Sequence, residues 1–250
     1  MSRFAGKTVM ITGAARGFGA LAAKMFAAEG AKVALGDVLP EVHDVAAEVG
    51  GKALHCDVSN EAEVKALVEM AADMGGGRLD VGLNNAGIVH PLNKLANLDY
   101  ATFQQQIAVN AGGCFLCMKY QLPIMAAEGG GAIVNTASVA GLGSAPLLAA
   151  YAAAKHAVIG LTKSAADEYA RANVRVNAIC PSFTDTPMAD ELRVTQEAGS
   201  EVDPKFLGRI PMRRVAAPEE IVQAMLWAAS PENSFMTGQA IALDGGLTAT

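Results

Sequence analysis

The chain has 250 residues, of which 52% are hydrophobic and 18% charged, and 19 Lys and Arg residues against 25 Asp and Glu residues give a net charge of −6. This length and apolar content are typical of one large globular domain, or of two small ones, with an ample core. The acidic balance disfavours a nucleic-acid partner, and no apolar run is long enough to span a membrane, so neither is an expected partner.

The N-terminal residues lack the apolar segment of a secretion signal, and four scattered cysteines are too few for a disulfide framework. Both features favour a cytoplasmic location. Cys114 and Cys117 have the spacing of a zinc or redox pair, but they lie inside a helical pattern without a second pair. We expect them to pack in the core, and we expect no metal site.

Short apolar runs alternate with helical periodicity along the whole chain. Because the runs are nearly all apolar rather than alternating, they indicate strands of a parallel sheet that helices cover on both faces. The expected strands are Lys7–Thr12, Lys32–Asp37, Ala53–Asp57, Leu79–Asn84, Ala132–Thr136, Val174–Ile179 and Ala240–Leu243.

Helical periods fill the intervals between these strands. The expected helices start near Phe18, at Pro40-Glu41 and after an Asn60-x-x-Glu63 capping box, and three more cover Asp99–Ala127 except near Pro123, Tyr151–Arg171 and Pro218–Ala229. No linker or repeat divides the chain. Residues 1–250 are therefore expected to form one doubly wound α/β (Rossmann) domain with about seven parallel strands.

Residues 181–211 interrupt this alternation with a stretch rich in proline, polar and charged residues. The stretch begins where the sixth expected strand ends. In this fold an insertion at that place is typical of a substrate lid, although a solvated surface loop stays an alternative.

A glycine-rich turn follows the first strand and opens the first helix. Glycines at such a turn let the backbone approach a pyrophosphate, which then lies at the positive end of the helix. The candidate cofactor residues here are Gly13, Arg16, Gly17, Phe18 and Gly19.

Asp37 lies 20 residues beyond Gly17, at the end of the second strand. An acid there can accept hydrogen bonds from the ribose hydroxyls of NAD. Val38 follows it, so no adjacent cation is available to hold the 2′-phosphate of NADP. NAD is therefore the expected cofactor, and NADP stays open because Arg16 can serve that phosphate from the glycine turn.

Three motifs occur in one order: Gly13-x-x-x-Gly17-x-Gly19, Asn84-Asn85-Ala86-Gly87 and Tyr151-x-x-x-Lys155. Together they resemble the short-chain dehydrogenase/reductase family. The resemblance extends over the whole chain, from Lys7 to Asp244-Gly245-Gly246.

Tyr151 and Lys155 lie at i and i+4 and so share one helix face, where the ammonium can stabilise a phenolate. Ser138, just past the fifth strand, can hydrogen-bond a substrate oxygen as charge develops there. This set predicts reversible hydride transfer with Tyr151 as acid and base. The resemblance implies that Lys155 also binds the cofactor ribose and that Asn110 joins a water-linked proton relay.

The resemblance implies further cofactor contacts. Asp57 and Val58 match residues at the adenine, and Asn85 and Gly87 match residues that line the ribose or brace the strand. At the nicotinamide the corresponding residues are Pro181, Thr184 and Thr186. Ser182 and Thr184 depart from the usual family pattern, so the backbone contacts at 182–184 stay open.

The substrate pocket is expected to be mostly apolar. Its candidate residues, besides Ser138 and Tyr151, are His90, Val139, Leu142, Ser144, Leu147, Phe183 and Met188. Such a set suits a secondary alcohol or ketone of modest size, including diols and hydroxyketones. The stretch Ala132–Pro187 most resembles NAD-linked bacterial alcohol and diol dehydrogenases.

Two other functions stay as alternatives. A 3-oxoacyl-(acyl-carrier-protein) reductase needs NADPH and a basic docking face, which Asp37 and the run Ala126-Ala127-Glu128-Gly129 do not favour. A non-catalytic NAD-sensing module has no need of Tyr151 and Lys155 together with Ser138.

The helix Pro218–Ala229 carries an apolar stripe, and Trp227 lies off it, which leaves a second apolar surface. The resemblance implies a homotetramer in which this helix meets a symmetry mate.

Overall fold

The structure is a computed structural model that describes residues 2–188 and 207–249. Within these ranges seven parallel strands form one sheet in the order β3-β2-β1-β4-β5-β6-β7, which confirms the expected doubly wound α/β fold. The strands are β1 (Thr8–Thr12), β2 (Lys32–Asp37), β3 (Lys52–His55), β4 (Val81–Asn84), β5 (Gly131–Thr136), β6 (Val174–Pro181) and β7 (Ala240–Leu243).

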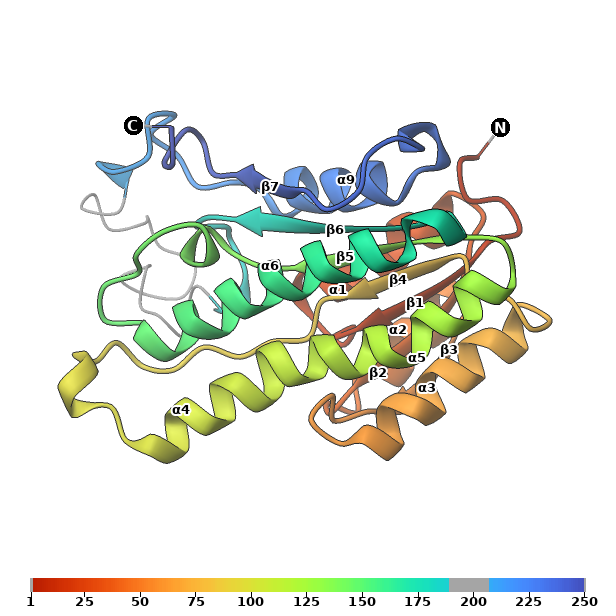
Figure 1. Cartoon of the computed structure of the whole chain (residues 1–250), viewed down its shortest axis with the longest axis horizontal. Helices are drawn as coiled ribbons and strands as arrows, with labels where there is room; N and C mark the ends of the chain where they lie inside the picture. The colour runs from red at the N-terminus through yellow and green to blue at the C-terminus, as the bar shows by residue number, and fades with distance from the viewer. Residues whose placement is uncertain (1, 189–206, 250) are drawn as a thin grey trace.

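Helices cover both faces of the sheet (Figure 1). One face packs against α3, α5 and α6, and the other against α1, α2 and α9, so that two apolar clusters lie on opposite sides of the strands. The helices are α1 (Gly17–Ala28), α2 (Val42–Val49), α3 (Glu61–Met74), α4 (Tyr100–Gln106), α5 (Gly113–Ala127), α6 (Ala149–Tyr169) and α9 (Pro218–Ala229). None of these described helices has both the length and the apolar character needed to cross a bilayer.

The central strands are apolar throughout because helices cover them on both sides. Every residue of β1, β4 and β6 is buried. Cys114 and Cys117 belong to the cluster beneath α5, which confirms that they pack in the core.

The start of α3 differs in detail from the expected capping box. The Asn60 side chain accepts a hydrogen bond from Ala62 N, as an N-cap should. Glu63, however, does not return to the Asn60 backbone. Its carboxylate accepts from Asp57 N and from the Asn60 side-chain amide, because the preceding turn brings both donors nearer.

The expected break near Pro123 is wrong, because α5 continues through that residue. Proline removes one backbone hydrogen bond and costs roughly 3 kcal/mol inside a helix. Leu122 and Met125 flank it and are buried against the sheet, and this packing outweighs the penalty. The irregular part of this helical stretch lies earlier, in the π-helix η2 (Ile107–Gly112).

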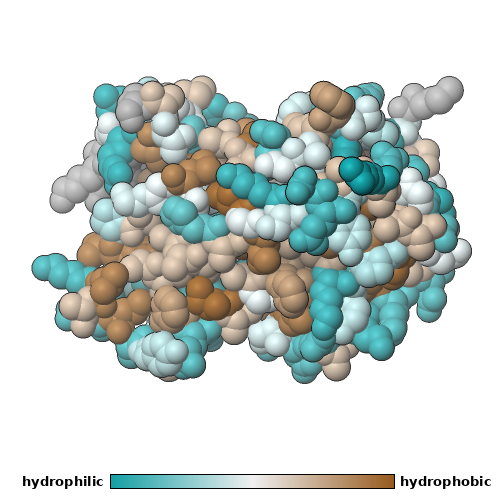
Figure 2. Space-filling model, viewed as in Figure 1, coloured by the Kyte–Doolittle hydropathy of each residue, from teal (hydrophilic) through white to brown (hydrophobic). Residues whose placement is uncertain are grey.

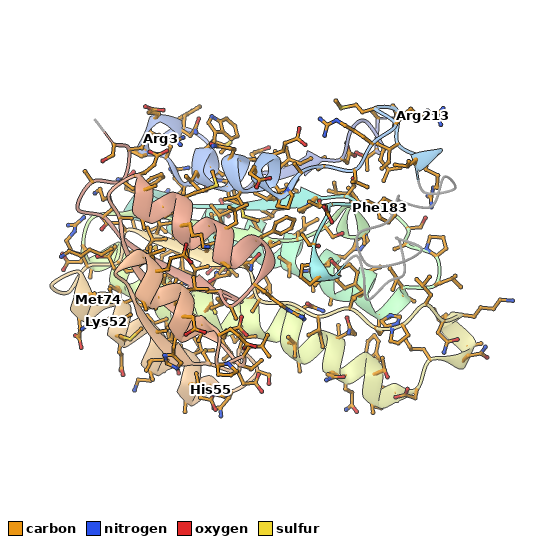
Figure 3. The ribbon with its side chains drawn as sticks, turned by 180° about the vertical axis from the view of Figure 1, so that it is seen from behind. Arg3, Lys52, His55, Met74, Phe183 and Arg213 are labelled. Carbon is orange, nitrogen blue, oxygen red and sulfur yellow. The ribbon has the colours of Figure 1, made fainter. Side chains whose placement is uncertain are left out.

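Most of the expected insertion lies outside the described residues. Its described parts are 181–188, which starts at the last residue of β6, and 207–211, whose Arg209 lines the same cavity as Phe183. A backbone bridge joins Thr184 to Ala216 there. Seen from behind in Figure 3, Phe183 lies just past the end of β6, at the opposite end of the molecule from Arg3 and Met74.

Candidate active site

A cavity of about 760 Å³ lies at the carboxyl ends of the strands. It begins where β1 pairs with both β2 and β4, so that the connections leave the sheet in opposite directions. In open α/β sheets this reversal of strand order creates the crevice where dinucleotides bind. The cavity is large enough for a cofactor with part of a substrate.

The glycine turn lines one end of this cavity with Gly13, Arg16, Gly17 and Phe18. Gly13 has a φ of 66°, and a Cβ there would come within 2.8 Å of the Ala86 backbone. Any larger residue would be strained and would push the turn away from β4. Gly19 lines no part of the cavity; a Cβ on it would collide with the Gly13 carbonyl, so it allows α1 to pack close to the turn.

The first turn of α1 is suited to bind an anion. The side chain of its N-cap residue, Arg16, makes no capping hydrogen bond, and the turn contains no acidic residue. Its backbone N–H groups and the positive end of the helix dipole therefore favour a phosphate. This geometry fits the pyrophosphate of a dinucleotide.

Asp37 and Asp57 line the same end of the cavity. The Asp37 carboxylate accepts hydrogen bonds from Ala15 N at 2.9 Å and from Leu39 N at 3.0 Å, one on each oxygen. Each oxygen keeps a further lone pair for a ribose hydroxyl. Asp57 Oδ1 accepts hydrogen bonds from the backbone N–H and the hydroxyl of Ser59, and these local bonds stabilise the turn that follows β3.

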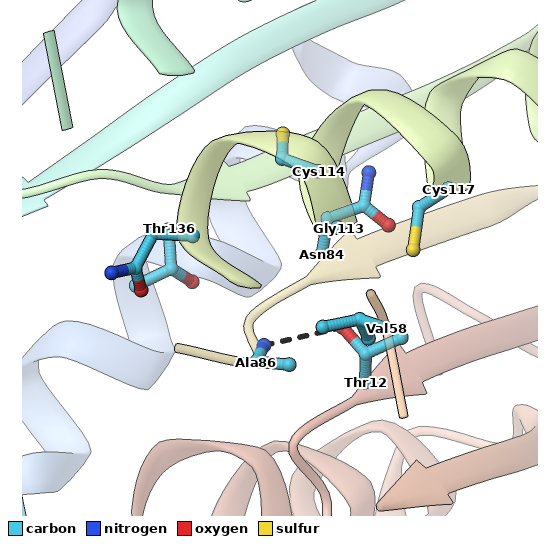
Figure 4. A pocket seen from close by; sticks show the side chains of 9 residues that line it. Thr12, Val58, Asn84, Ala86, Gly113, Cys114, Cys117 and Thr136 are labelled. Carbon is cyan, nitrogen blue, oxygen red and sulfur yellow. Dashed lines mark hydrogen bonds between the residues drawn. The ribbon is translucent and has the colours of Figure 1, made fainter. Parts of the chain in front are cut away.

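Asn85 acts mainly as a brace. Its amide nitrogen donates to the carbonyls of Thr12 and Gly13, and its Oδ1 accepts from Thr136 Oγ1. Thr12 Oγ1 in turn accepts from the backbone N–H of Ala86, as Figure 4 shows. The strand ends of β1, β4 and β5 are thus joined beneath the cavity, next to a small pocket that has no room for a water molecule.

Tyr151 and Lys155 lie on α6 and are 9% and 3% exposed. Lys155 Nζ donates to the Thr136 carbonyl at 2.8 Å and lies 5.5 Å from the centre of the Tyr151 ring. Ser138 lies at the start of a 3₁₀ turn, where its Oγ accepts from Ala140 N. The three side chains line the cavity together.

Burial shifts the pKa of both helix residues toward the neutral form. It raises the pKa of Tyr151 to about 12, against the effect of a hydrogen bond with Ser138, which lowers it. Burial also lowers the pKa of Lys155 to about 8. Without a further positive charge nearby, Tyr151 is therefore a neutral phenol at pH 7.

Asn110 is located in the π-helix η2, and all its side-chain polar atoms have partners. Its Oδ1 accepts from Ile88 N, and its Nδ2 donates to the Ile88 carbonyl and to Gln106 Oε1. A Cβ on Gly87 would lie 2.7 Å from Asn110 Oδ1, so glycine is needed for this approach. Asn110 thus fixes the chain that leaves β4 along the cavity.

The other predicted residues divide into two groups. Leu142 and Leu147 do not line the cavity and are 39% and 42% exposed, which corrects that prediction. Leu147 has a φ of 69°, and this left-handed turn accompanies its exposure to solvent. The predicted residues that do line the cavity are Val58, Gly87, His90, Val139, Ser144, Pro181, Phe183, Thr184, Thr186 and Met188.

Among the lining residues that the sequence did not predict, two hold other groups of the site in place. Gln106 is buried and holds Asn110, and its position four residues earlier on the same helix was the available signal. Thr136 provides the carbonyl that accepts from Lys155, and a backbone role leaves no trace in residue type.

The glycine turn, the uncapped helix end and the buried Tyr151 and Lys155 in one cavity define the class of protein, a dinucleotide-binding oxidoreductase. Residues 13–248 match the family model described as enoyl-(acyl carrier protein) reductase. The chain belongs to the short-chain dehydrogenase/reductase family. As a member it is an oxidoreductase that uses a nicotinamide cofactor and acts on CH–OH groups or the corresponding carbonyls.

Individual relatives cover the whole chain. It is 42% identical to 2,5-dichloro-2,5-cyclohexadiene-1,4-diol dehydrogenase of Sphingobium indicum, across 100% of both chains. It is 39% identical to a 3-oxoacyl-(acyl-carrier-protein) reductase of Thermotoga maritima, across 98% of this chain and 99% of the relative. Among solved structures, levodione reductase superimposes with a TM-score of 0.92 at 34% identity, across 99% of each chain.

Proposed function

We propose that this enzyme transfers a hydride reversibly between a secondary alcohol and NAD, with Tyr151 as the acid and base. The observation that carries the proposal is the placement of Tyr151, Ser138 and Lys155 on the wall of the cavity that begins at the glycine turn. The diol dehydrogenase relative supports the choice of an alcohol, diols included.

A nicotinamide cofactor, held by the glycine turn, Asp37 and Lys155, would supply the hydride-transfer chemistry in both directions. The residues of the chain handle the proton and the oxygen. Ser138 Oγ holds the substrate oxygen. In oxidation the Tyr151 phenolate takes the hydroxyl proton, and in reduction the neutral Tyr151 phenol gives its proton to the carbonyl oxygen. Lys155 Nζ stabilises the phenolate and binds a ribose hydroxyl.

We further propose that Lys155 passes the proton onward along a water-linked relay that Asn110 helps to position. We also propose that the insertion 181–211 covers the substrate. The support for this lid is that Phe183, Met188 and Arg209, from its two described parts, line the cavity.

A 3-oxoacyl-(acyl-carrier-protein) reductase is the second candidate, favoured by the Thermotoga relative. Against it, Asp37 does not suit NADPH, and no cation lies in the 126–129 segment that ends α5. A panel of secondary alcohols and 3-oxoacyl thioesters, each with NAD(H) and NADP(H), separates the two. Turnover of the thioesters alone contradicts the alcohol proposal.

Tyr151→Phe tests the acid and base directly. The ring still packs in the same site, so only the proton-transfer group is lost. We expect kcat to fall below about 1% of the native value, the lower end of the effect of general acid–base catalysis, while NAD binds with nearly the same Kd. Fluorescence titration with NADH measures the second quantity. A variant that keeps more than a few per cent of the activity contradicts the assignment.

The preference for NAD rests on the Asp37 carboxylate. Hydrogen bonds from ribose hydroxyls to a charged acceptor contribute roughly 1.5–3 kcal/mol, and a 2′-phosphate loses them and meets a like charge. At about 1.4 kcal/mol per tenfold, we expect NAD to be preferred at least about tenfold in kcat/KM. Val38 is exposed and lines the cavity beside it. Asp37→Ser together with Val38→Arg should therefore reverse the preference. Equal use of both cofactors by the native enzyme contradicts this part.

We also propose a homotetramer in the cytoplasm. The four cysteines are free thiols buried in the fold, which agrees with a reducing compartment. Exposed apolar side chains on two helices, Phe115 on α5 and Trp227 on α9, support the assembly.

A further inference from the structure

His90 is a buried side chain on the cavity wall that the proposed chemistry leaves unused. Only 3% of its surface is exposed, although it lines the same cavity as Tyr151 and Ser138. Its Nδ1 lies 2.8 Å from the Pro91 carbonyl oxygen. Its Nε2 is buried and has no hydrogen-bond partner among the described residues.

The Pro91 contact fixes which ring nitrogen carries the proton. A carbonyl oxygen only accepts hydrogen bonds, so Nδ1 must donate to it. A neutral imidazole has a single N–H, and Nε2 is therefore a bare acceptor. An acceptor that stays buried without a donor is unfavourable, so Nε2 requires a group that carries a hydrogen.

Residues before and after His90 in the chain contact α6 or the segment just before it. Val89 packs against the small cluster that contains Tyr151. Asn93 N donates to the Leu147 carbonyl at 2.9 Å, just before α6 begins. The position of His90 relative to Tyr151 is thus fixed by contacts that do not depend on a ligand.

The surroundings select the kind of donor. The lining residues Val89, Ala145 and Leu148, which pack against the small cluster that contains Tyr151, are apolar. A ketone, an ether or an ionised carboxylate has no hydrogen to give to Nε2, whereas a hydroxyl group has one. A hydroxyl is also neutral and can enter an apolar pocket at lower cost than an ammonium.

We propose that Nε2 of His90 accepts a hydrogen bond from a second hydroxyl of the substrate, one that does not react. The substrates are then diols in the oxidative direction and hydroxyketones in the reductive one. This inference rests on the proposed alcohol oxidation at Tyr151. His90 is a specificity-determining residue and takes no part in moving the proton or the hydride.

The test compares cyclohexanol, cyclohexane-1,2-diol, cyclohexane-1,4-diol and the monomethyl ethers of both diols, with NAD in excess. The ethers keep the size and the second oxygen but lose the hydrogen that Nε2 needs. We expect the native enzyme to favour at least one diol over cyclohexanol by about tenfold or more in kcat/KM, since a site built for a hydroxyl discriminates against its absence. The ether of that diol should lose the advantage.

Two variants separate the acceptor from the fold. His90→Asn keeps a donor near the Nδ1 position for the Pro91 carbonyl but removes the acceptor at Nε2. His90→Gln places an amide oxygen near the Nε2 position. We expect the ratio of kcat/KM for the diol to that for cyclohexanol to fall at least about fivefold in the first variant and to stay within about threefold of native in the second.

Each outcome bears on a defined claim. Native activity on cyclohexanol with equal activity on the diols and their ethers overturns the assignment of His90 and leaves the proposed alcohol oxidation intact. A diol preference that His90→Asn does not change also overturns it, because the selectivity then comes from other residues. No turnover of any alcohol overturns both claims.

Discussion

At the scale of single residues, burial determines the chemistry of Lys155. Its ammonium lies inside the protein, where the Thr136 carbonyl is its hydrogen-bond acceptor, and burial lowers its pKa from the ordinary 10.5 to about 8. Electrostatic interactions with Cys114 and Cys180 raise this pKa, in opposition to burial. Below about pH 8 the folded protein must therefore keep a buried charge.

This shift gives a prediction for stability against pH. Between about pH 8 and 10.5 the unfolded chain holds a proton on Lys155 that the folded chain has lost, so the free energy of unfolding rises with pH. Relative to Lys155→Met, the native protein should gain about 1–2 kcal/mol from pH 7 to pH 9. Urea denaturation of both proteins without cofactor measures the difference. A difference that is flat or falls with pH contradicts the buried, charged lysine.

Residue patterns predicted part of the site and not the rest. Tyr151 and Lys155 were predictable because the spacing i and i+4 puts them on one helix face, and Asp37 because it ends a strand after the glycine turn. The burial of His90 was not predictable, since it depends on the hydrogen bond that holds Asn93 to the segment before α6. Such long-range contacts leave no local pattern in the sequence.

At the scale of elements, the end of α9 depends on a residue from another element. Its last turn contains no basic side chain. Arg175 on β6 supplies the charge instead, and its two terminal nitrogens donate to the carbonyls of Ala228, Ala229, Ser230 and Met236. The guanidinium satisfies three carbonyls at the helix end, where the dipole also favours a cation, and a fourth in the loop that follows.

Arg175→Met should therefore destabilise the protein without harming the chemistry. It leaves several buried carbonyls without donors, and each such group costs roughly 1–3 kcal/mol. We expect a loss of about 2–4 kcal/mol in the free energy of unfolding and faster amide hydrogen exchange in 226–238. The free energy of unfolding of Arg175→Lys should lie between those of the native protein and Arg175→Met, because an ammonium lacks the planar arrangement of donors that a guanidinium has. A loss below about 0.5 kcal/mol contradicts this role.

The ends of some helices and strands were predicted better than the irregularities within the helices. The ranges Pro218–Ala229 and Ala240–Leu243 match the structure at both ends, because Pro at the first turn and a short apolar run are strong local signals. The continuous α5 and the π-helix before it were not predicted, since packing against the sheet and the bonds of Asn110 decide them.

At the scale of the whole molecule, several large apolar side chains are exposed outside the cavity. Phe115 on α5 is 49% exposed and Trp227 on α9 is 44% exposed, and these helices lie on opposite faces of the sheet. Figure 2 shows further apolar side chains on the left half of one face, toward α4. Two separate apolar surfaces are what an assembly with two kinds of two-fold interface requires.

The tetramer can be tested by mass and by substitution. Light scattering at micromolar concentration should give four times the chain mass. Trp227→Glu and Phe115→Glu each place a charge on one of the two surfaces, and we expect each to yield dimers if its surface is an interface. A monomeric native protein contradicts the proposed assembly.

The π-helix has a consequence for the length of the chain. A π-turn behaves as one residue inserted into an α-helix, and each α-helical residue turns the chain by about 100°. Removing a single residue from Ile107–Gly112 would restore the regular winding and rotate everything before it, so that Gln106 would swing away from Asn110. The number of residues in this stretch is therefore more strictly required than the identity of its exposed side chains: the site should tolerate many exchanges of those side chains but not a deletion of one residue.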